Sequence, residues 1–216
     1  MIDRVLAQVA NGILALPYER SIVAVDGVDG AGKTTLADEL AGELRKRRVS
    51  VVRASVDGFH NPRSVRYARG RASPEGYFLD SYNYSALRHF LIDPFTAGAL
   101  QVHTTRFDHR SDSVITDAIA DISGTCILLL DGIFLHRDEL QGLWSFGIFL
   151  DVPFEETFRR MAIRDGCSPD PFVEQNRRYV EGQSIYRRLC NPRRRATLVI
   201  DNAVIGGRTI IRGEQA

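Results

Sequence analysis

The segment Gly27–Thr34, GVDGAGKT, constrains the fold more than any other part of the chain. It matches the pattern G-x-x-x-x-G-K-[ST], follows the short apolar run SIVAVD, and opens a stretch with the helical spacing of Leu36, Leu40 and Leu44. Glycines let the backbone approach an anion closely, and the amide groups at the start of a helix point at its oxygens. The sequence therefore predicts a strand, a phosphate-binding turn and a helix in immediate succession.

The residue types in this turn suit a bound nucleoside triphosphate, ATP or GTP, together with Mg²⁺. Lys33 is expected to reach the β- and γ-phosphates, the Thr34 hydroxyl to coordinate Mg²⁺, and Thr35 to contact the α-phosphate. The other nucleotide-binding positions predicted here are Gly27, Asp29, Gly30, Ala31 and Gly32. The alternative is a chance glycine turn, which the strand before it and the helix after it disfavour.

The remaining chain alternates short apolar runs with helical segments. The runs lie at residues 21–26, 51–56, 126–131, 146–151 and 196–201, and a helix is predicted at about residues 2–16, before Pro17. Continuous apolar runs are typical of strands buried on both faces, so we expect a three-layer α/β/α fold with a mostly parallel sheet. Because ligands gather at the carboxyl ends of such strands, the aspartates that end the runs should share one rim; these are Asp26, Asp57, Asp131, Asp151 and Asp201.

Composition limits the partners and the compartment. The formal net charge of +1 gives no strong field toward nucleic acid or a membrane surface. The three cysteines form no C-x-x-C pair, which favours a reducing compartment over a disulfide framework or a zinc site. The N-terminal pattern reads as an amphipathic helix and not as a signal peptide, so the cytoplasm is the expected location.

Other features distinguish among the classes of protein that contain such a turn. An N-K-x-D guanine signature is absent, which disfavours a GTPase switch, and no transporter signature follows CILLLD. The run at 51–56 leads into Asp57, Gly58, Phe59 and His60. A carboxylate at that strand end would overhang the γ-phosphate, where it could accept a proton from a hydroxyl or hold the metal. The alternative for Asp57 is a turn-capping role.

From about Ser21 to Asn202 the chain resembles the uridine kinase and phosphoribulokinase family of P-loop kinases, which includes the bacterial pantothenate kinases. The resemblance implies that Asp57 is the catalytic base, with His60 beside it in the acceptor site where the family usually has tyrosine. It also implies that Asp131, in Asp131-Gly132-Ile133, stands for the family's glutamate and binds Mg²⁺ with Thr34 and Asp57.

The same resemblance implies further acceptor-binding residues. Asp80, in FLDSYNYSAL, resembles the family's ribose-binding aspartate. Phe107 and Asp108 stand where the family has a tyrosine–aspartate pair at the nucleobase, so the aromatic face is kept and the hydroxyl is lost.

Two arginines in DVPFEETFRRMAIRD, Arg160 and Arg164, correspond to the family's lid arginines. Their i, i+4 spacing places both on one helical face, where they could stabilise the transferring phosphoryl group together with Lys33. Arg164 would also contact the substrate. The alternative for Arg160 is a surface ion pair with Glu156.

Two stretches depart from the family pattern within the single domain expected over residues 1–216, whose N-terminal helical segment is 1–17. Residues 58–83 are predicted to be a substrate loop and residues 165–195 a lid. The first carries Arg63, Arg66, Arg69 and Arg71, which either recognise a phosphate or carboxylate on the acceptor or form a solvated basic loop.

The prediction is an ATP-dependent phosphotransferase acting on a hydroxyl of a small molecule, with a pyrimidine nucleoside, uridine or cytidine, as the first choice of acceptor. Pantothenate, a sugar or a phosphorylated sugar are the alternatives among enzymes. The alternative that is not an enzyme is a regulatory module that binds a nucleotide without catalysis. Neither nucleic acid nor membrane is an expected partner, and a homo-oligomer is left open.

Overall fold

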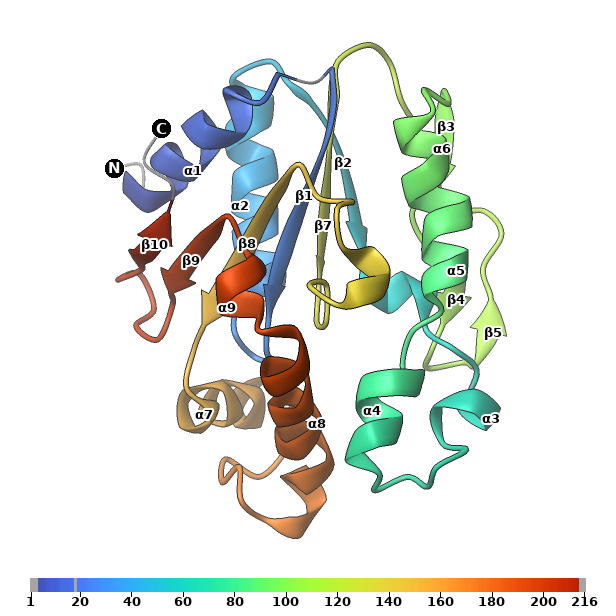
Figure 1. The fold of residues 1–216 in the computed structure, drawn as a ribbon, viewed down its shortest axis with the longest axis vertical. Helices are drawn as coiled ribbons and strands as arrows, with labels where there is room; N and C mark the ends of the chain where they lie inside the picture. Colours follow the sequence, from blue (N-terminus) through green and yellow to red (C-terminus); the bar gives the residue numbers. More distant parts are fainter. Residues whose placement is uncertain (1–3, 18, 214–216) are drawn as a thin grey trace.

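Six strands form one sheet in the computed structural model, which describes residues 4–17 and 19–213 (Figure 1). The strand order is β10-β9-β8-β1-β7-β2, with β10 antiparallel to β9 and the other neighbours parallel. The bounds are β1 Arg20–Gly27, β2 Ser50–Ser55, β7 Cys126–Gly132, β8 Phe146–Asp151, β9 Leu198–Asp201 and β10 Thr209–Gly213. The predicted strands and the mostly parallel sheet are confirmed, although β2 ends one residue early and β9 begins two residues late.

Helices cover both faces of this sheet and make the predicted three layers (Figure 1). On one face lie α1 Arg4–Leu14 and α2 Lys33–Lys46. The other face is covered by α5 Tyr84–Leu87, η2 Arg88–Ile92, α6 Asp93–Thr96, η3 Asp138–Leu140 and α9 Pro192–Arg195. The helix predicted at 2–16 is confirmed at residues 4–14 and ends two residues early, and residues 2 and 3 lie outside the described residues.

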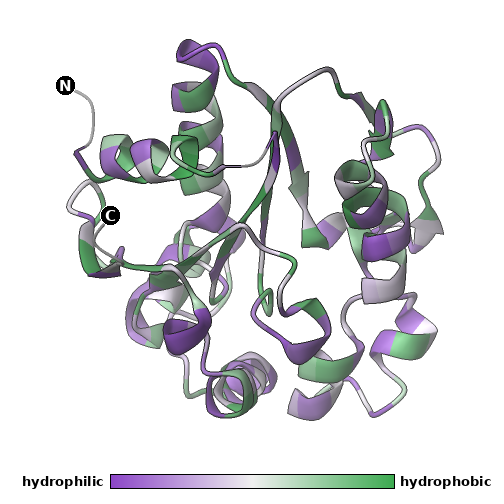
Figure 2. Ribbon diagram, turned by 45° about the horizontal axis from the view of Figure 1, so that its top comes forward, coloured by the Kyte–Doolittle hydropathy of each residue, from purple (hydrophilic) through white to green (hydrophobic). Residues whose placement is uncertain are grey.

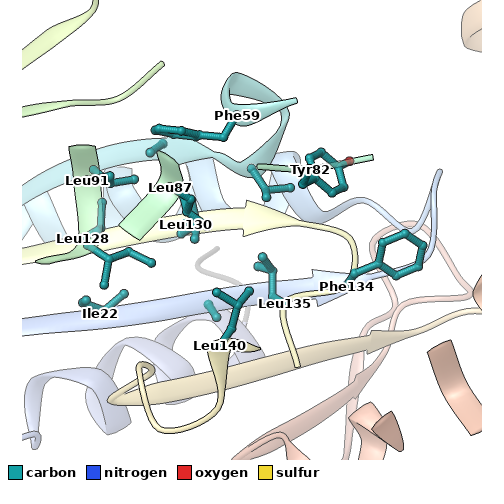
Figure 3. Close-up of a cluster of buried hydrophobic side chains, with 14 of the residues drawn as sticks. Ile22, Phe59, Tyr82, Leu87, Leu91, Leu128, Leu130, Phe134, Leu135 and Leu140 are labelled. Atoms are coloured by element: carbon teal, nitrogen blue, oxygen red, sulfur yellow. The ribbon is translucent and has the colours of Figure 1, made fainter. Parts of the chain in front are cut away.

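Alternate residues of each central strand face the two layers. In β1, Val23 and Val25 pack toward α1 and α2, whereas Ile22 and Ala24 join the cluster on the other face. Figure 3 shows that second cluster, with Leu128 and Leu130 beneath the short helices. Fully burying one such side chain contributes roughly 1.5–3 kcal/mol, so continuous apolar runs are stable only at the centre of the sheet. Figure 2 shows this distribution, with green strands inside and purple faces on the outer helices.

The two stretches that depart from the alternating pattern are helical and packed together. Residues 58–83 contain the end of η1 Val56–Phe59, α3 Arg63–Arg66 and α4 Pro74–Asp80, and residues 165–195 contain α8 Glu174–Cys190 and α9. The ring of Tyr77 meets Tyr179 edge to face at 5.1 Å. A Cβ on Gly182 would lie 2.6 Å from the Tyr77 ring, so glycine permits the close approach of α8 to α4. The predicted substrate loop and lid are therefore in contact along these two helices.

Two small antiparallel pairs lie beyond α6. They are β3 Gln101–His103 with β6 Ile119–Asp121, and β4 Phe107–Asp108 with β5 Ser113–Val114. Among the described residues, no helix has the length and apolar character needed to cross a lipid bilayer.

Candidate active site

The phosphate-binding turn joins β1 to α2 and contains two glycines in the left-handed region of φ. Gly30 has φ +74° and Gly32 has φ +92°. A Cβ on Gly30 would lie 2.6 Å from the backbone oxygen of Thr157, and one on Gly32 would lie 2.8 Å from Asn202 Nδ2. The turn is therefore enclosed by α7 Phe154–Asp165 and by the segment after β9. Asn202 Nδ2 also donates a hydrogen bond of 2.8 Å to the carbonyl of Ala31, which fixes the turn against that segment.

Lys33 and Thr34 begin α2 and point back to the turn and the sheet. Lys33 Nζ donates to the carbonyl of Val28 at 2.9 Å. The Thr34 hydroxyl donates to Asp131 Oδ2 at 2.7 Å, although the two residues are 97 positions apart. Arg53 lies 2.9 Å from the other Asp131 oxygen. A hydroxyl beside a carboxylate is a suitable donor set for Mg²⁺, which takes few protein ligands and completes its shell with phosphates and water.

A cavity of about 360 Å³ opens over this turn. It is lined by Gly30, Gly32, Lys33, Thr34, Thr35, Arg159, Arg160, Met161, Ile163, Arg164 and Ile205. The turn, α7 and the segment between β9 and β10 thus enclose one volume, and the structure brings the predicted arginines 160 and 164 to it.

The two arginines differ in how firmly they are held. Arg160 pairs with Glu156 at 2.6 Å and donates to the carbonyls of Asn202 and Ala203 at 2.7 and 2.8 Å. Arg160 therefore forms the ion pair with Glu156 that was predicted as the alternative, and it also lines the cavity. Hydrogen bonds from Arg159 and then Arg160 lower the pKa of Glu156 to about 2, so this carboxylate stays ionised. Arg164 is 68% exposed and pairs with Asp165, its neighbour in the chain. Its side chain is therefore held less firmly than that of Arg160.

Asp57 lies exposed in η1, directly after β2. Its Oδ1 accepts a hydrogen bond of 2.8 Å from the Tyr82 hydroxyl. Burial, reinforced by Asp57, holds the pKa of Tyr82 well above its usual range, so this hydroxyl remains a donor. The turn is capped by Ser55, whose side chain accepts from the Asp57 amide. Because Ser55 caps this turn and the Asp57 carboxylate accepts from Tyr82, the contacts disfavour the turn-capping alternative for the Asp57 side chain.

His60 lies next to Asp57 in a small aromatic group. Its ring centroid is 4.5 Å from that of Tyr82 and 4.6 Å from that of His109. Its Nδ1 is 2.8 Å from the carbonyl oxygen of Asp57, which makes Nδ1 the donor. Burial lowers the pKa of His60 below its usual 6.5, so the ring is neutral at pH 7.

Asp29 belongs to the phosphate-binding turn, but its carboxylate points to the helices α4 and α8. Oδ2 accepts from the Tyr77 hydroxyl at 2.5 Å and from Gln183 Nε2 at 3.4 Å. The side chain of Asp29 is therefore engaged by α4 and α8, whereas its backbone belongs to the turn that is predicted to contact the nucleotide.

Three predicted acceptor residues lie farther along the chain. Asp80 pairs with Arg69 at 2.9 Å. Asp108 accepts from the Ser111 hydroxyl at 2.7 Å and from the Arg110 amide at 2.9 Å, and these bonds lower its pKa. Asp108 therefore closes the turn between β4 and β5, and Phe107, half-buried in β4, carries the aromatic face.

Contacts within the protein engage most of the arginines of the predicted substrate loop. Arg63 donates to the carbonyl of Arg110 at 2.8 Å, and Arg66, which is buried, donates to the carbonyl of Asn61 at 2.8 Å. Arg69 holds Asp80, while Arg71 lies over the Tyr67 ring at 5.0 Å. These contacts favour a structural role over recognition of a phosphate on the acceptor.

Sequence reasoning missed the residues that hold the site together across long separations. Tyr77, Tyr82 and Gln183 place the carboxylates, Asn202 holds the turn through Ala31, and Ile205 lines the cavity. The density of tyrosines in GYFLDSYNY was the one available signal, because a buried tyrosine hydroxyl needs a partner.

Known proteins resemble this chain in sequence and in fold. No protein-family model matches it. The uridine kinase of Ureaplasma parvum is 25% identical over 145 residues, which span 67% of this chain and 68% of that protein. Nicotinamide riboside kinase 1 of Mus musculus is 27% identical over 154 residues, 71% of each chain. The solved structure of a possible uridine kinase from Bacillus stearothermophilus superimposes with a TM-score of 0.72 and 25% identity, covering 90% of this chain and 96% of that one.

The fold and the phosphate-binding turn define a P-loop kinase that acts on a small molecule. Within that class, similarity in sequence and in fold to uridine kinases supports a place among the uridine kinase and phosphoribulokinase-like P-loop kinases.

Proposed function

We propose that the protein transfers the γ-phosphate of ATP to a hydroxyl of a riboside that carries no negative charge, with a pyrimidine nucleoside as the first candidate. The observation that carries this proposal is the exposed Asp57 carboxylate, which Tyr82 orients after β2, on the same rim of the parallel sheet as the phosphate-binding turn. Similarity to uridine kinases supports the pyrimidine nucleoside.

Charge argues for an acceptor without a phosphate of its own. Asp29 and Asp57 both present carboxylates beside the buried tyrosines 77 and 82. Of the arginines in the substrate loop, Arg69 is paired with Asp80, and Arg63 and Arg66 donate to backbone carbonyls. A phosphorylated sugar would bring its negative charge next to these carboxylates, whereas a neutral or cationic riboside would not be repelled.

In the proposed reaction Asp57 accepts the proton of the acceptor hydroxyl as its oxygen bonds to the γ-phosphorus. The bond from that phosphorus to the β,γ-bridging oxygen breaks, and ADP leaves. Lys33, Arg160 and Arg164 stabilise negative charge on the transferring group. Thr34 and Asp131, with Asp57 in the inner or outer shell, would hold Mg²⁺, which supplies charge neutralisation at the phosphates. The nucleobase of ATP would lie between Ile163 and Ile205, whose side chains line the cavity.

A second acceptor, nicotinamide riboside, is favoured by one observation. The similarity to nicotinamide riboside kinase 1 extends over 71% of the chain, and that acceptor carries a positive charge that the two carboxylates would attract.

An acceptor panel tests the proposal. ADP release from ATP is measured with uridine, cytidine, nicotinamide riboside, pantothenate, ribose and ribose 5-phosphate. We expect turnover with at least one of the three ribosides and none with ribose 5-phosphate. Turnover with ribose 5-phosphate or pantothenate alone would refute the charge argument. Tight ATP binding without turnover on any acceptor would support the regulatory module instead.

A further inference from the structure

Arg53 lies on β2 beside the carboxylate that is proposed to hold Mg²⁺, and the proposed reaction gives it no role. Its Nη2 is 2.9 Å from Asp131 Oδ1. The other carboxylate oxygen, Oδ2, accepts from the Thr34 hydroxyl at 2.7 Å. Both oxygens of this buried carboxylate therefore have partners within the protein itself.

The guanidinium of Arg53 is fixed on several sides. Nη1 donates to the carbonyls of Ala54 and Leu129 at 3.1 and 2.8 Å. Leu129 is the partner of Arg53 in the parallel pairing of β2 with β7, and Asp131 lies two residues farther along β7 (Figure 1). Nε is 3.0 Å from Asp38 Oδ1. A positive charge held in this way stays next to Asp131 when a second cation approaches Oδ2.

Burial makes that charge effective. The side chains of Arg53 and Asp131 are 18% and 3% exposed, so solvent screens the pair only in part. A cation beside a carboxylate lowers the affinity of that carboxylate for a second cation, by about 10- to 1,000-fold where the second cation is a proton. The order that Arg53 imposes on Asp131 acts in the opposite direction, but fixing one short side chain is worth about 5-fold or less. Repulsion between the two cations is therefore the larger effect.

The protein offers few other ligands to a divalent cation on its own. In residues 4–17 and 19–213, no group of three or more His, Cys, Asp or Glu side chains is arranged to hold a metal ion. The donors beside the phosphate-binding turn are the Thr34 hydroxyl and Asp131 Oδ2. A hard cation that needs about six oxygens must take most of them from phosphates and water.

We propose that Arg53 is the counter-ion of Asp131 in the nucleotide-free protein, and that it keeps divalent cations from the site until nucleotide phosphates bring them in. The phosphates supply the negative charge and the oxygens that outweigh the guanidinium. Arg53 then sets the metal affinity of the site without contacting either substrate. The inference rests on the metal site of the proposed function, but it is tested by metal binding without an acceptor, so either can fail alone.

Mn²⁺ is the probe, because it takes the same oxygen ligands as Mg²⁺ and its unbound ion is measured by electron paramagnetic resonance. It is titrated into the full chain with and without ADP. We expect the wild type to bind Mn²⁺ at least about 10-fold more tightly with ADP than without it. Without ADP, Arg53→Met should lower the Kd of Mn²⁺ by at least about 10-fold.

A gain of metal affinity separates the proposal from a merely structural role of Arg53, because structural damage at the site would weaken binding. The neutral variant leaves the buried Asp131 carboxylate without its cation, so its Tm should fall and should recover as Mn²⁺ is added. Unchanged or weaker Mn²⁺ binding in Arg53→Met would overturn the proposal. Equal affinities of the wild type with and without ADP would overturn it without the use of any variant.

Two further variants distinguish charge from geometry and location. Arg53→Lys keeps the charge and loses the planar fork, so it should bind Mn²⁺ as weakly as the wild type. The control is Arg45→Met, because Arg45 is exposed on α2 and donates to another carbonyl of β2, that of Val51, at 3.0 Å. It should behave as wild type. An increase in Arg53→Lys or Arg45→Met equal to that in Arg53→Met would contradict the assignment to the charge of Arg53.

Discussion

Replacing Gly30 by alanine tests how closely α7 packs on the phosphate-binding turn. At φ +74° a residue with a Cβ carries a strain of roughly 1–2 kcal/mol. The new Cβ would also lie 2.6 Å from the Thr157 oxygen and 3.0 Å from Met161 Cγ. The Thr157 oxygen belongs to the backbone of α7, so it cannot move without displacing the helix that carries Arg160 and Arg164. Such overpacking adds about 1–3 kcal/mol.

The expected loss of stability is therefore at least about 2 kcal/mol, which lowers Tm by at least roughly 4 °C in a protein of this size. Thermal unfolding and titration with an ATP analogue measure the two consequences, and we expect nucleotide affinity to fall by more than about 10-fold. Gly42→Ala is the matched control, because a Cβ at that position in α2 has no heavy atom within 4 Å. It should raise stability by roughly 0.5–1 kcal/mol. Wild-type Tm and nucleotide affinity in Gly30→Ala would refute the packing of α7 against the turn.

Three further predictions concern single side chains. Lys33→Ala should weaken ATP binding by about 10- to 100-fold, the scale of a charged hydrogen bond, and calorimetry showing wild-type affinity would contradict the role of this lysine. Asp131→Asn should raise the Mg²⁺ concentration needed for half-maximal turnover. The control is Asp38→Asn, which removes the other carboxylate beside Arg53 and should leave that concentration unchanged. Equal effects of the two substitutions would assign the change to Arg53. Because burial lowers the pKa of His60, the stability that its neutral ring contributes is complete above pH 6.5 and is lost as pH falls through the folded pKa. Unfolding from pH 7 to 5 should therefore show a smaller loss of Tm in His60→Phe, and parallel curves would refute this.

Local patterns in the sequence were sufficient for the sheet and the phosphate-binding turn. The run CILLLD became β7, every residue of which is buried, and GVDGAGKT became the turn with the glycine torsions it requires. Arg160 and Arg164 could be placed together because their spacing along a helix fixes a common face.

Contacts between residues far apart in the sequence could not be predicted from such local patterns. The carboxylate of Asp29 is held by Tyr77 and Gln183, which are 48 and 154 residues away, so its direction follows from how α4 and α8 pack. The loop arginines illustrate the same limit, because only the fold shows that Arg66 meets the carbonyl of Asn61. The buried pair of His136 and Asp26 gave no signal, since neither residue belongs to a motif that requires the other.

The most direct test of the proposed chemistry is the turnover of Asp57→Asn on the best acceptor, measured at saturating ATP and acceptor. Asparagine keeps an oxygen to accept from Tyr82 but cannot take the proton of the acceptor hydroxyl. We expect kcat to fall by at least about 10²-fold, the scale of general-base catalysis, while the Kd of an ATP analogue stays within about twofold of wild type. A wild-type kcat would contradict the assignment of Asp57 as the base.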